Sequence, residues 1–194
     1  MDDCMDGLTV CGCTRCEALV DSRSRIVDGV GPADADLLFV GEAPGANEDE
    51  QGKPFVGRSG DVLDDALRAG GLARTDVRIT NCVRCRPPDN RDPRGAELAN
   101  CRGYLDAEIT QVDPALLVTL GKVPAEHLLG RDVAVTAEAG DVDDCDVGGT
   151  RYPVMLSVHP AATLYDPSQQ ETFTETIRAA AEYASGDQST FGDF

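Results

Sequence analysis

The chain has 194 residues, of which 41% are hydrophobic, and this suits one globular domain rather than a disordered chain. The sequence has no apolar run of the roughly 20 residues that a membrane helix needs. Its acidic start lacks the pattern of a signal peptide, so a cytoplasmic location is expected. The net charge of -18 argues at first against nucleic-acid binding, which normally relies on Lys and Arg.

The acidic residues are spread along the whole chain, and only Lys53 and Lys122 are lysines among the 17 basic residues. This composition is typical of a protein adapted to high salt, and an ordinary acidic cytosolic protein is the alternative. At molar salt the Debye length is about 3 Å, so the mutual repulsion is largely screened. The charge therefore bears on solubility and partners rather than on fold.

Strands and helices are expected to alternate along the chain. Short apolar segments predict buried strands at 36–41, 77–83, 115–121 and 153–159. Apolar residues at helical spacing predict helices at 59–69, 94–112, 122–129 and 172–184. Together they predict a single α/β domain over 1–194, with three α/β/α layers and a central four-stranded parallel sheet. The acidic segment 131–151 is expected to form an edge hairpin or loop, and 186–194 a frayed tail.

Three predicted strands end in residues that can bind a ligand. The first runs into Gly41-Glu-Ala-Pro-Gly45, the second contains Asn81, and the fourth ends in His159-Pro160. In open α/β sheets, ligands bind beyond the carboxyl ends of the strands. A Gly-rich turn, an amide and an imidazole are therefore expected to meet in one pocket.

The chain contains eight cysteines, and metal binding is the best explanation in a reducing compartment. Cys13 and Cys16 form a close pair, and Cys82 and Cys85 have the same spacing, so these four could bind zinc. The rival set replaces Cys82 with Cys101, because Cys82 falls inside a strand, where a small thiol often simply packs. We favour Cys13, Cys16, Cys85 and Cys101, since thiolates from such scattered segments suit a [4Fe–4S] cluster.

Five sequence blocks occur in a specific order: GEAPGANED at 41–49, GKPFVG at 52–57, TN at 80–81, CRPPDNR at 85–91 and VHP at 158–160. Together with the four cysteines, this order resembles the family 4 uracil-DNA glycosylases, the iron–sulfur branch of that superfamily. The resemblance covers roughly residues 13–164. It implies a hydrolase of base-excision DNA repair that releases uracil from DNA, leaves an abasic site and carries a [4Fe–4S] cluster.

The resemblance also implies roles in binding the base. Phe55 is the aromatic residue on which the flipped uracil would stack, next to Gly41. Asn81 would read O4 and N3–H, because its amide offers one donor group and one acceptor. Glu48 would stand where other branches of the superfamily exclude the methyl group of thymine.

Two further residues receive catalytic roles by the same resemblance. His159 would stabilise charge on uracil O2 as the glycosidic bond breaks. Glu42 would activate the attacking water, because the position that carries an Asp in the best-known branch is Ala43 here. No lysine lies beside Asn81 or in the His159 loop, so a monofunctional enzyme is expected, although Lys53 lies near Phe55.

Contacts to DNA would come from a local group of basic residues: Arg58, Arg84, Arg86 and Arg91. The alternative is that these side chains are solvated and paired with Asp89 and Asp92. After His159 the family often has an Arg in a loop that enters the minor groove, and this Arg is missing here. Leu164 or Tyr165 would still wedge the duplex.

The expected partner is uracil-containing DNA, and the protein is expected to be a monomer that binds no membrane. A sliding clamp is a possible protein partner for an enzyme of DNA repair. Two other functions stay open on the sequence. One is a catalytically silent, nucleic-acid-binding member of the superfamily. The other is a zinc-stabilised nucleotide-binding module of a different class.

Overall fold

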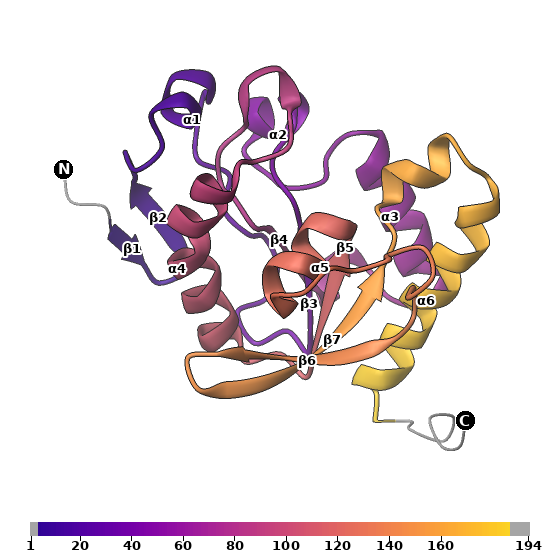
Figure 1. The fold of residues 1–194 in the computed structure, drawn as a ribbon. Helices are drawn as coiled ribbons and strands as arrows, with labels where there is room; N and C mark the ends of the chain where they lie inside the picture. The colour runs from indigo at the N-terminus through magenta and orange to yellow at the C-terminus, as the bar shows by residue number, and fades with distance from the viewer. Residues whose placement is uncertain (1–3, 187–194) are drawn as a thin grey trace.

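The computed structural model describes residues 4–186, which are built around a five-stranded sheet with the order β4-β3-β5-β7-β6 (Figure 1). Its strands are β3 (Leu37–Gly41), β4 (Arg78–Asn81), β5 (Leu116–Leu120), β6 (Val142–Val147) and β7 (Thr150–Ser157). The four predicted strands are confirmed and run parallel, while β6 adds an antiparallel edge next to β7.

Two pairs of helices cover the two faces of this sheet (Figure 1). On one face lie α4 (Gly95–Val112) and α5 (Lys122–Leu129), and on the other lie α3 (Arg58–Ala69) and α6 (Ser168–Ala184). Side chains alternate between the two cores along each strand, so Leu38 packs toward α4 and α5 and Phe39 toward α3 and α6. The predicted three-layer architecture is therefore confirmed.

The segment 131–151 forms an edge hairpin together with the start of β7, as predicted. Its turn is Gly148-Gly149, and both residues have positive φ, at 63° and 85°. Glycine adopts positive φ at little cost, so this pair suits the tight turn between β6 and β7.

Several short elements were not expected from the sequence. They are β1 (Cys4–Asp6), β2 (Thr9–Gly12), α1 (Glu17–Ser22), α2 (Ala46–Gln51) and the 3-10 turns η1 (Arg74–Asp76), η2 (Pro88–Asn90) and η3 (Pro160–Leu164). The two short helices span six residues each, too few to show an apolar repeat. The predicted frayed tail lies beyond residue 186, outside the described residues. No helix within 4–186 is long and apolar enough to cross a bilayer.

The free edge of β4 is covered by the segment that follows α1. Val30 pairs with Ile79 in an isolated antiparallel bridge, and the Val27 N–H donates to the Arg84 carbonyl at 2.8 Å. These contacts protect a sheet edge that would otherwise expose unpaired backbone groups. They also bring the cysteine-containing N-terminal region beside the loop after β4.

Candidate functional site

A cavity of about 170 Å³ lies at the carboxyl ends of the parallel strands. It has room for one small planar ring. Its lining combines residues from the loop after β3, the end of β4, the first turn of α3 and the loop after β7: Ala43, Gly45, Glu48, Phe55, Ser59, Asn81 and His159. The strand-end residues predicted to meet, an amide and an imidazole beside the Gly-rich turn, are therefore brought together here.

Asn81 ends β4 opposite Gly41 of β3, and its side chain is almost fully buried, at 2% exposure. Within the described residues its Oδ1 has no hydrogen-bond partner. A Cβ on Gly41 would lie 2.6 Å from ring atoms of Phe55 and would collide with Asn81 Oδ1. Gly41 thus permits the Asn81 amide and the Phe55 ring to approach each other. The buried amide oxygen of Asn81 can still accept a hydrogen bond from a ligand.

Phe55 has a left-handed backbone conformation, with φ of 52°, which is uncommon for a bulky residue. The carboxylate of Glu48 holds the following backbone, accepting from Val56 N at 3.0 Å and Gly57 N at 3.2 Å. A Cβ at Gly60 would collide with the Phe55 carbonyl, so α3 packs directly on this loop. Strained residues persist where their surroundings fix them, often at functional sites.

His159 lies opposite Phe55, with ring centroids 5.8 Å apart. Its Nδ1 accepts the Ala161 N–H at 3.0 Å, which assigns the proton of the neutral ring to Nε2. Burial lowers the pKa of His159 to about 4, against an opposing effect of the Glu48 carboxylate. At neutral pH the imidazole is therefore an uncharged N–H donor.

The two acidic residues with predicted roles differ in position. Glu48 lines the cavity, but its oxygens accept backbone N–H groups of Gly45, Val56 and Gly57, so it organises the loop. Glu42 is partly buried next to the cavity residue Ala43 and does not itself line the cavity. Burial, with a smaller effect of the nearby Asp92 carboxylate, raises the pKa of Glu42 to about 7.

Ser59 is a lining residue that the sequence did not single out. It lies in the first turn of α3, where a hydroxyl residue is normally interpreted as part of a helix start. Its place two residues after the GKPFVG block was the available signal. The loop-organising role of Glu48 was also missed, because two of its backbone partners, Val56 and Gly57, lie beyond the helix that carries it.

A second cavity is lined by all four of the favoured cysteines, which come from three separate segments. Cys13 and Cys16 precede α1, Cys85 follows β4, and Cys101 lies in α4. Cys82 is fully buried and packs in the core beneath α4 and α5. The lining of this cavity therefore contains Cys101 rather than Cys82.

Polar side chains donate to the cysteine sulfurs around this cavity. Arg23 Nη1 lies 2.9 Å from Cys85 Sγ, and Asn100 Nδ2 lies 3.4 Å from Cys16 Sγ. Such donors stabilise thiolates that bind metal. Within 4–186 no three Cys, His, Asp or Glu side chains converge tightly enough to hold a single metal ion. Four thiols around one cavity are a donor set of the kind that holds an iron–sulfur cluster or a structural zinc ion.

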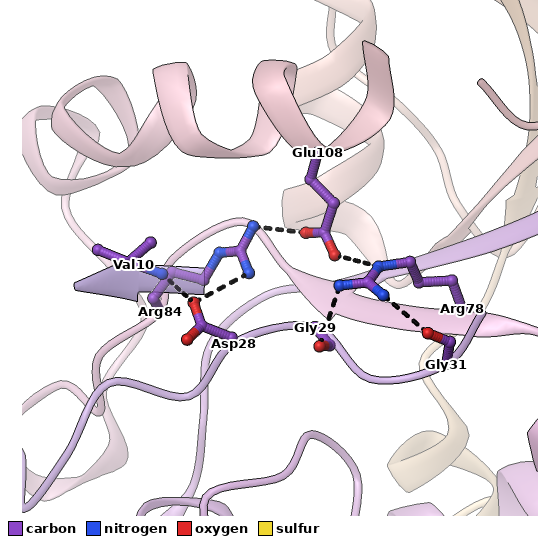
Figure 2. Close-up of polar contacts among 7 residues, drawn as sticks. All are labelled: Val10, Asp28, Gly29, Gly31, Arg78, Arg84 and Glu108. Atoms are coloured by element: carbon purple, nitrogen blue, oxygen red, sulfur yellow. Dashed lines mark hydrogen bonds and ion pairs between the residues drawn. The ribbon is translucent and has the colours of Figure 1, made fainter. Parts of the chain in front are cut away.

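Figure 2 shows a buried ion-pair network around Glu108. One of its members, Arg84, also lines the cysteine cavity. The fully buried Glu108 of α4 accepts from Arg78 on one oxygen and from Arg84 on the other. Arg78 also donates to the carbonyls of Gly29 and Gly31. Asp28 lies 3.7 Å from Arg84. The network joins α4 to β4, the loop after it and the segment that covers the edge of β4.

Arg84 corrects one sequence-based prediction. We expected it to contact DNA, but it is 1% exposed and paired with Glu108, so it cannot reach a phosphate at the surface. Arg91 donates two hydrogen bonds to the Glu97 carboxylate, at 2.8 and 2.6 Å, rather than to the carboxylates of Asp89 or Asp92. Its Nη1 also donates to the backbone carbonyl of Asp92 at 2.8 Å.

The other two predicted DNA contacts remain accessible. Arg58 is exposed at the start of α3, and Arg86 is partly exposed and donates to Asn90 at 2.7 Å. Beyond the His159 loop, Leu164 is 37% exposed and Tyr165 is 83% exposed. In the sequence, Arg58 follows the Phe55 loop and Leu164 and Tyr165 follow His159, whereas Arg86 lies next to Cys85 in the loop after β4.

Comparison with known proteins shows the family to which the chain belongs. A model of the uracil DNA glycosylase superfamily matches residues 29–181. The type-4 uracil-DNA glycosylase of Archaeoglobus fulgidus is 35% identical over 95% of this chain and 94% of its own length. That of Saccharolobus solfataricus is 37% identical over 94% and 86%, and that of Thermotoga maritima 39% over 81% of each. The chain therefore belongs to the type-4 branch of the uracil-DNA glycosylase superfamily.

Proposed function

We propose that this chain hydrolyses the N-glycosidic bond of deoxyuridine in DNA, releasing uracil and leaving an abasic site. The observation that carries this proposal is the buried Oδ1 of Asn81, which has no hydrogen-bond partner among the described residues. A buried acceptor without a donor is costly. The N3–H of a bound uracil would supply the missing donor, and membership of the type-4 glycosylases supports this base.

In this proposal the uracil leaves the duplex and stacks on Phe55. The Asn81 amide accepts from N3–H and donates to O4, whereas cytosine presents the reverse pattern and would leave both bonds unmade. Gly41 lets the base approach closely, because any side chain there would displace Phe55. Glu48 stands at the cavity wall as the residue proposed to exclude the thymine methyl group.

Bond cleavage sends negative charge onto the departing uracil. His159 is proposed to donate its Nε2–H to uracil O2, where that charge accumulates. A neutral imidazole suits this role, because it enters the reaction already carrying the proton and needs no change of protonation state at neutral pH. The rigid bond from Ala161 fixes the ring in one orientation.

Water activation is proposed for Glu42. A carboxylate with a pKa of about 7 is matched to the pH at which a general base operates in the cell. Its neighbour Ala43 lines the cavity, so a water between the Glu42 carboxylate and the sugar is the simplest arrangement.

DNA would be held by cations around the cavity and by a wedge at η3. Arg58 and Arg86 form no ion pair with a carboxylate within 4–186, and neither do the exposed Arg25 and Lys53 near the Phe55 loop. Such free cations are available to phosphates. We retain Arg91 as a weaker candidate, because a phosphate would have to replace Glu97. Tyr165 or Leu164 would fill the gap left by the flipped base.

The four cysteines of the second cavity are proposed to hold a [4Fe–4S] cluster: Cys13, Cys16, Cys85 and Cys101. When bound, the cluster would act as a structural cross-link, because glycosidic hydrolysis moves no electrons. Arg23 and Asn100 would donate to its thiolate ligands. A single domain over 1–194, a monomeric state, a cytoplasmic location and binding of a sliding clamp stay predictions.

The test is uracil release from a uracil-containing oligonucleotide, followed by alkaline cleavage at the abasic site, across a series of salt concentrations. Activity on the uracil strand and none on a matched thymine strand is expected. A protein that binds the oligonucleotide without releasing uracil would instead support the silent, binding-only alternative. Brown colour with broad visible absorption would support the cluster, and a colourless zinc-containing protein would contradict it.

A further inference from the structure

The short helix α2 is fixed on one side to the Phe55 loop. The bonds of Glu48 to the backbone of Val56 and Gly57 hold the two residues that follow Phe55. Because Phe55 has an unfavourable positive φ, the loop depends on such contacts to keep its ring in the cavity. The position of α2 therefore influences the surface on which the base would stack.

The next residue of the same helix, Asp49, is fixed on the other side. Its carboxylate is only 3% exposed, and both oxygens accept the Ser24 N–H, at 2.8 and 2.9 Å. The Arg25 N–H adds a longer bond of 3.3 Å. A buried carboxylate held by backbone N–H groups is a strong and directional anchor. It ties α2 to the segment that leaves α1.

Ser24 directly follows Arg23, which contacts the cysteine cavity. Arg23 Nη1 donates to Cys85 Sγ at 2.9 Å, and Nη2 donates to the Cys13 carbonyl at 2.7 Å. One guanidinium thus touches two of the three segments that carry the predicted cluster ligands. If those segments loosen, the end of α1 loses its attachment at the same time.

We propose that Arg23 and Asp49 are positioning residues that couple the occupied cysteine cavity to the affinity of the other cavity for uracil. The contacts run without a break from Cys85 through Arg23 and the Ser24 backbone to Asp49, and from Glu48 to the Phe55 loop. This inference rests on the proposed cluster and on uracil as the ligand. It assigns the cluster an effect on base binding beyond holding the fold together.

Coupling between two sites is reciprocal in binding free energy. If the bound cluster tightens uracil binding, bound uracil must stabilise the cluster-loaded state by the same factor. A residue with a merely structural role would lower the stability of the protein without changing this factor. The quantity to measure is therefore the ratio of the uracil affinity of cluster-loaded protein to that of cluster-free protein.

The experiment is a titration with free uracil, by calorimetry or ligand-observed NMR, of protein before and after the cluster is stripped by an iron chelator. Visible absorption establishes loading, and circular dichroism establishes folding. Stripped wild type should bind uracil about fivefold or more weakly than loaded wild type. Loaded Asp49→Asn should keep its visible absorption but bind uracil as weakly as stripped wild type. Removal of the cluster from this variant should lower its uracil affinity little further.

The matched control is Asp146→Asn, which also removes a carboxylate that accepts a backbone N–H, from Gly149 at 3.1 Å, but at the β6–β7 turn. This variant should show the same difference in uracil affinity between loaded and stripped protein as wild type does. Equal affinities of loaded and stripped wild type, or an unchanged ratio in Asp49→Asn, would overturn the coupling. A colourless protein would instead refute the proposed cluster, and a protein that releases no uracil from DNA would refute the proposed activity.

Stripping or substitution can also unfold the protein, and two measurements cover this. Arg23→Met keeps the length of the side chain but removes both donors. Its loaded and stripped forms should therefore bind uracil with the same affinity. In loaded protein, saturating uracil should slow the chelator-driven loss of visible absorption for wild type and Asp146→Asn. It should give no protection to Asp49→Asn or Arg23→Met, and equal protection in all four would contradict the proposal.

Discussion

The backbone N–H of Ala161 donates to Nδ1 of His159 at 3.0 Å, and this bond fixes both the tautomer and the orientation of the imidazole. The donor comes from η3, the turn that also carries the exposed residues proposed to enter DNA. The group that would stabilise the departing uracil and the proposed DNA wedge are therefore built on one short segment.

Replacement of His159 by alanine should reduce the single-turnover rate of uracil release by about 10²–10³-fold, the usual cost of removing one donor to a developing anion. Binding of uracil-containing DNA should change much less, because the bond to O2 strengthens mainly in the transition state. The control is His127→Ala, which alters the other histidine of the chain, on α5. Equal losses in the two variants would contradict the assignment.

The pH dependence should separate Glu42 from His159. If Glu42 is the base, kcat/KM rises with pH up to about 7, where the carboxyl group has ionised, and then levels. His159, with a pKa of about 4, should give no inflection between pH 5 and 8. Glu42→Gln should lower the plateau and remove the rising limb, and persistence of that limb would assign it to another group.

The same pKa predicts a stability effect with a definite sign. Because the pKa of Glu42 is raised from 4.5 to about 7, the folded state binds a proton more tightly than the unfolded chain between these values. Its contribution to stability is therefore present below pH 4.5 and is lost as the pH rises toward 7. The Tm of Glu42→Gln should exceed that of wild type by the largest amount at the upper end of this pH range.

Replacement of Gly41 by alanine should close the cavity with little effect on the fold. The new methyl group would lie 2.6 Å from the Phe55 ring and would displace it from its place opposite His159. A loss of about 10²-fold in kcat/KM is expected from a displacement of about 1 Å. Gly103→Ala is the control, since nothing lies within 4 Å of that added Cβ, and its activity should be unchanged.

The buried network of Figure 2 should dominate local stability. Glu108→Gln would leave Arg78 and Arg84 buried without their shared carboxylate, and should cost about 3–5 kcal/mol of unfolding free energy in urea titrations. Asp106→Asn, on the same helix, removes a half-exposed pair with Arg102 and should cost no more than about 1 kcal/mol. Similar costs for the two variants would contradict this account.

Contacts to DNA should appear in the salt dependence of binding. Arg58→Gln should reduce the slope of log K against log salt by about 0.9, the value expected for one lost phosphate contact. Arg151→Gln, at the β6–β7 hairpin and next to Asp144, should leave the slope unchanged. A slope that is the same in wild type and both variants would remove Arg58 from the DNA surface.

The sequence predicted the long elements, because each left a local pattern. The family resemblance named Glu48, Phe55, Asn81 and His159 among the cavity residues but not Ser59. The strand at Leu37–Gly41 is a continuous apolar run, and its residues are buried on both faces of the sheet. The strand β6 escaped prediction as a separate element, because VDDCDV carries acidic residues on an exposed edge. The helix α2 escaped because ANEDEQ has no apolar face, and its buried residue is Asp49.

Arg84 shows why the remaining errors could not be avoided. An arginine in a polar loop after a strand is normally at the surface. Its burial depends on Glu108, 24 positions away in the middle of a helix, and on Asp28 from a third segment. No local pattern records that pairing. The same holds for Asp49, whose partners precede it by 24 and 25 positions.

The exposure of Tyr165 also gives the protein an optical reporter. The chain contains no tryptophan and four tyrosines, so its intrinsic ultraviolet emission comes from tyrosine alone. Tyr104 and Tyr152 are buried, at 5% and 3% exposure, and Tyr183 is partly buried, whereas Tyr165, after the His159 loop, is 83% exposed. Insertion of the Tyr165 ring between bases would quench its fluorescence. Binding of unlabelled DNA would therefore be detected as a decrease in tyrosine fluorescence.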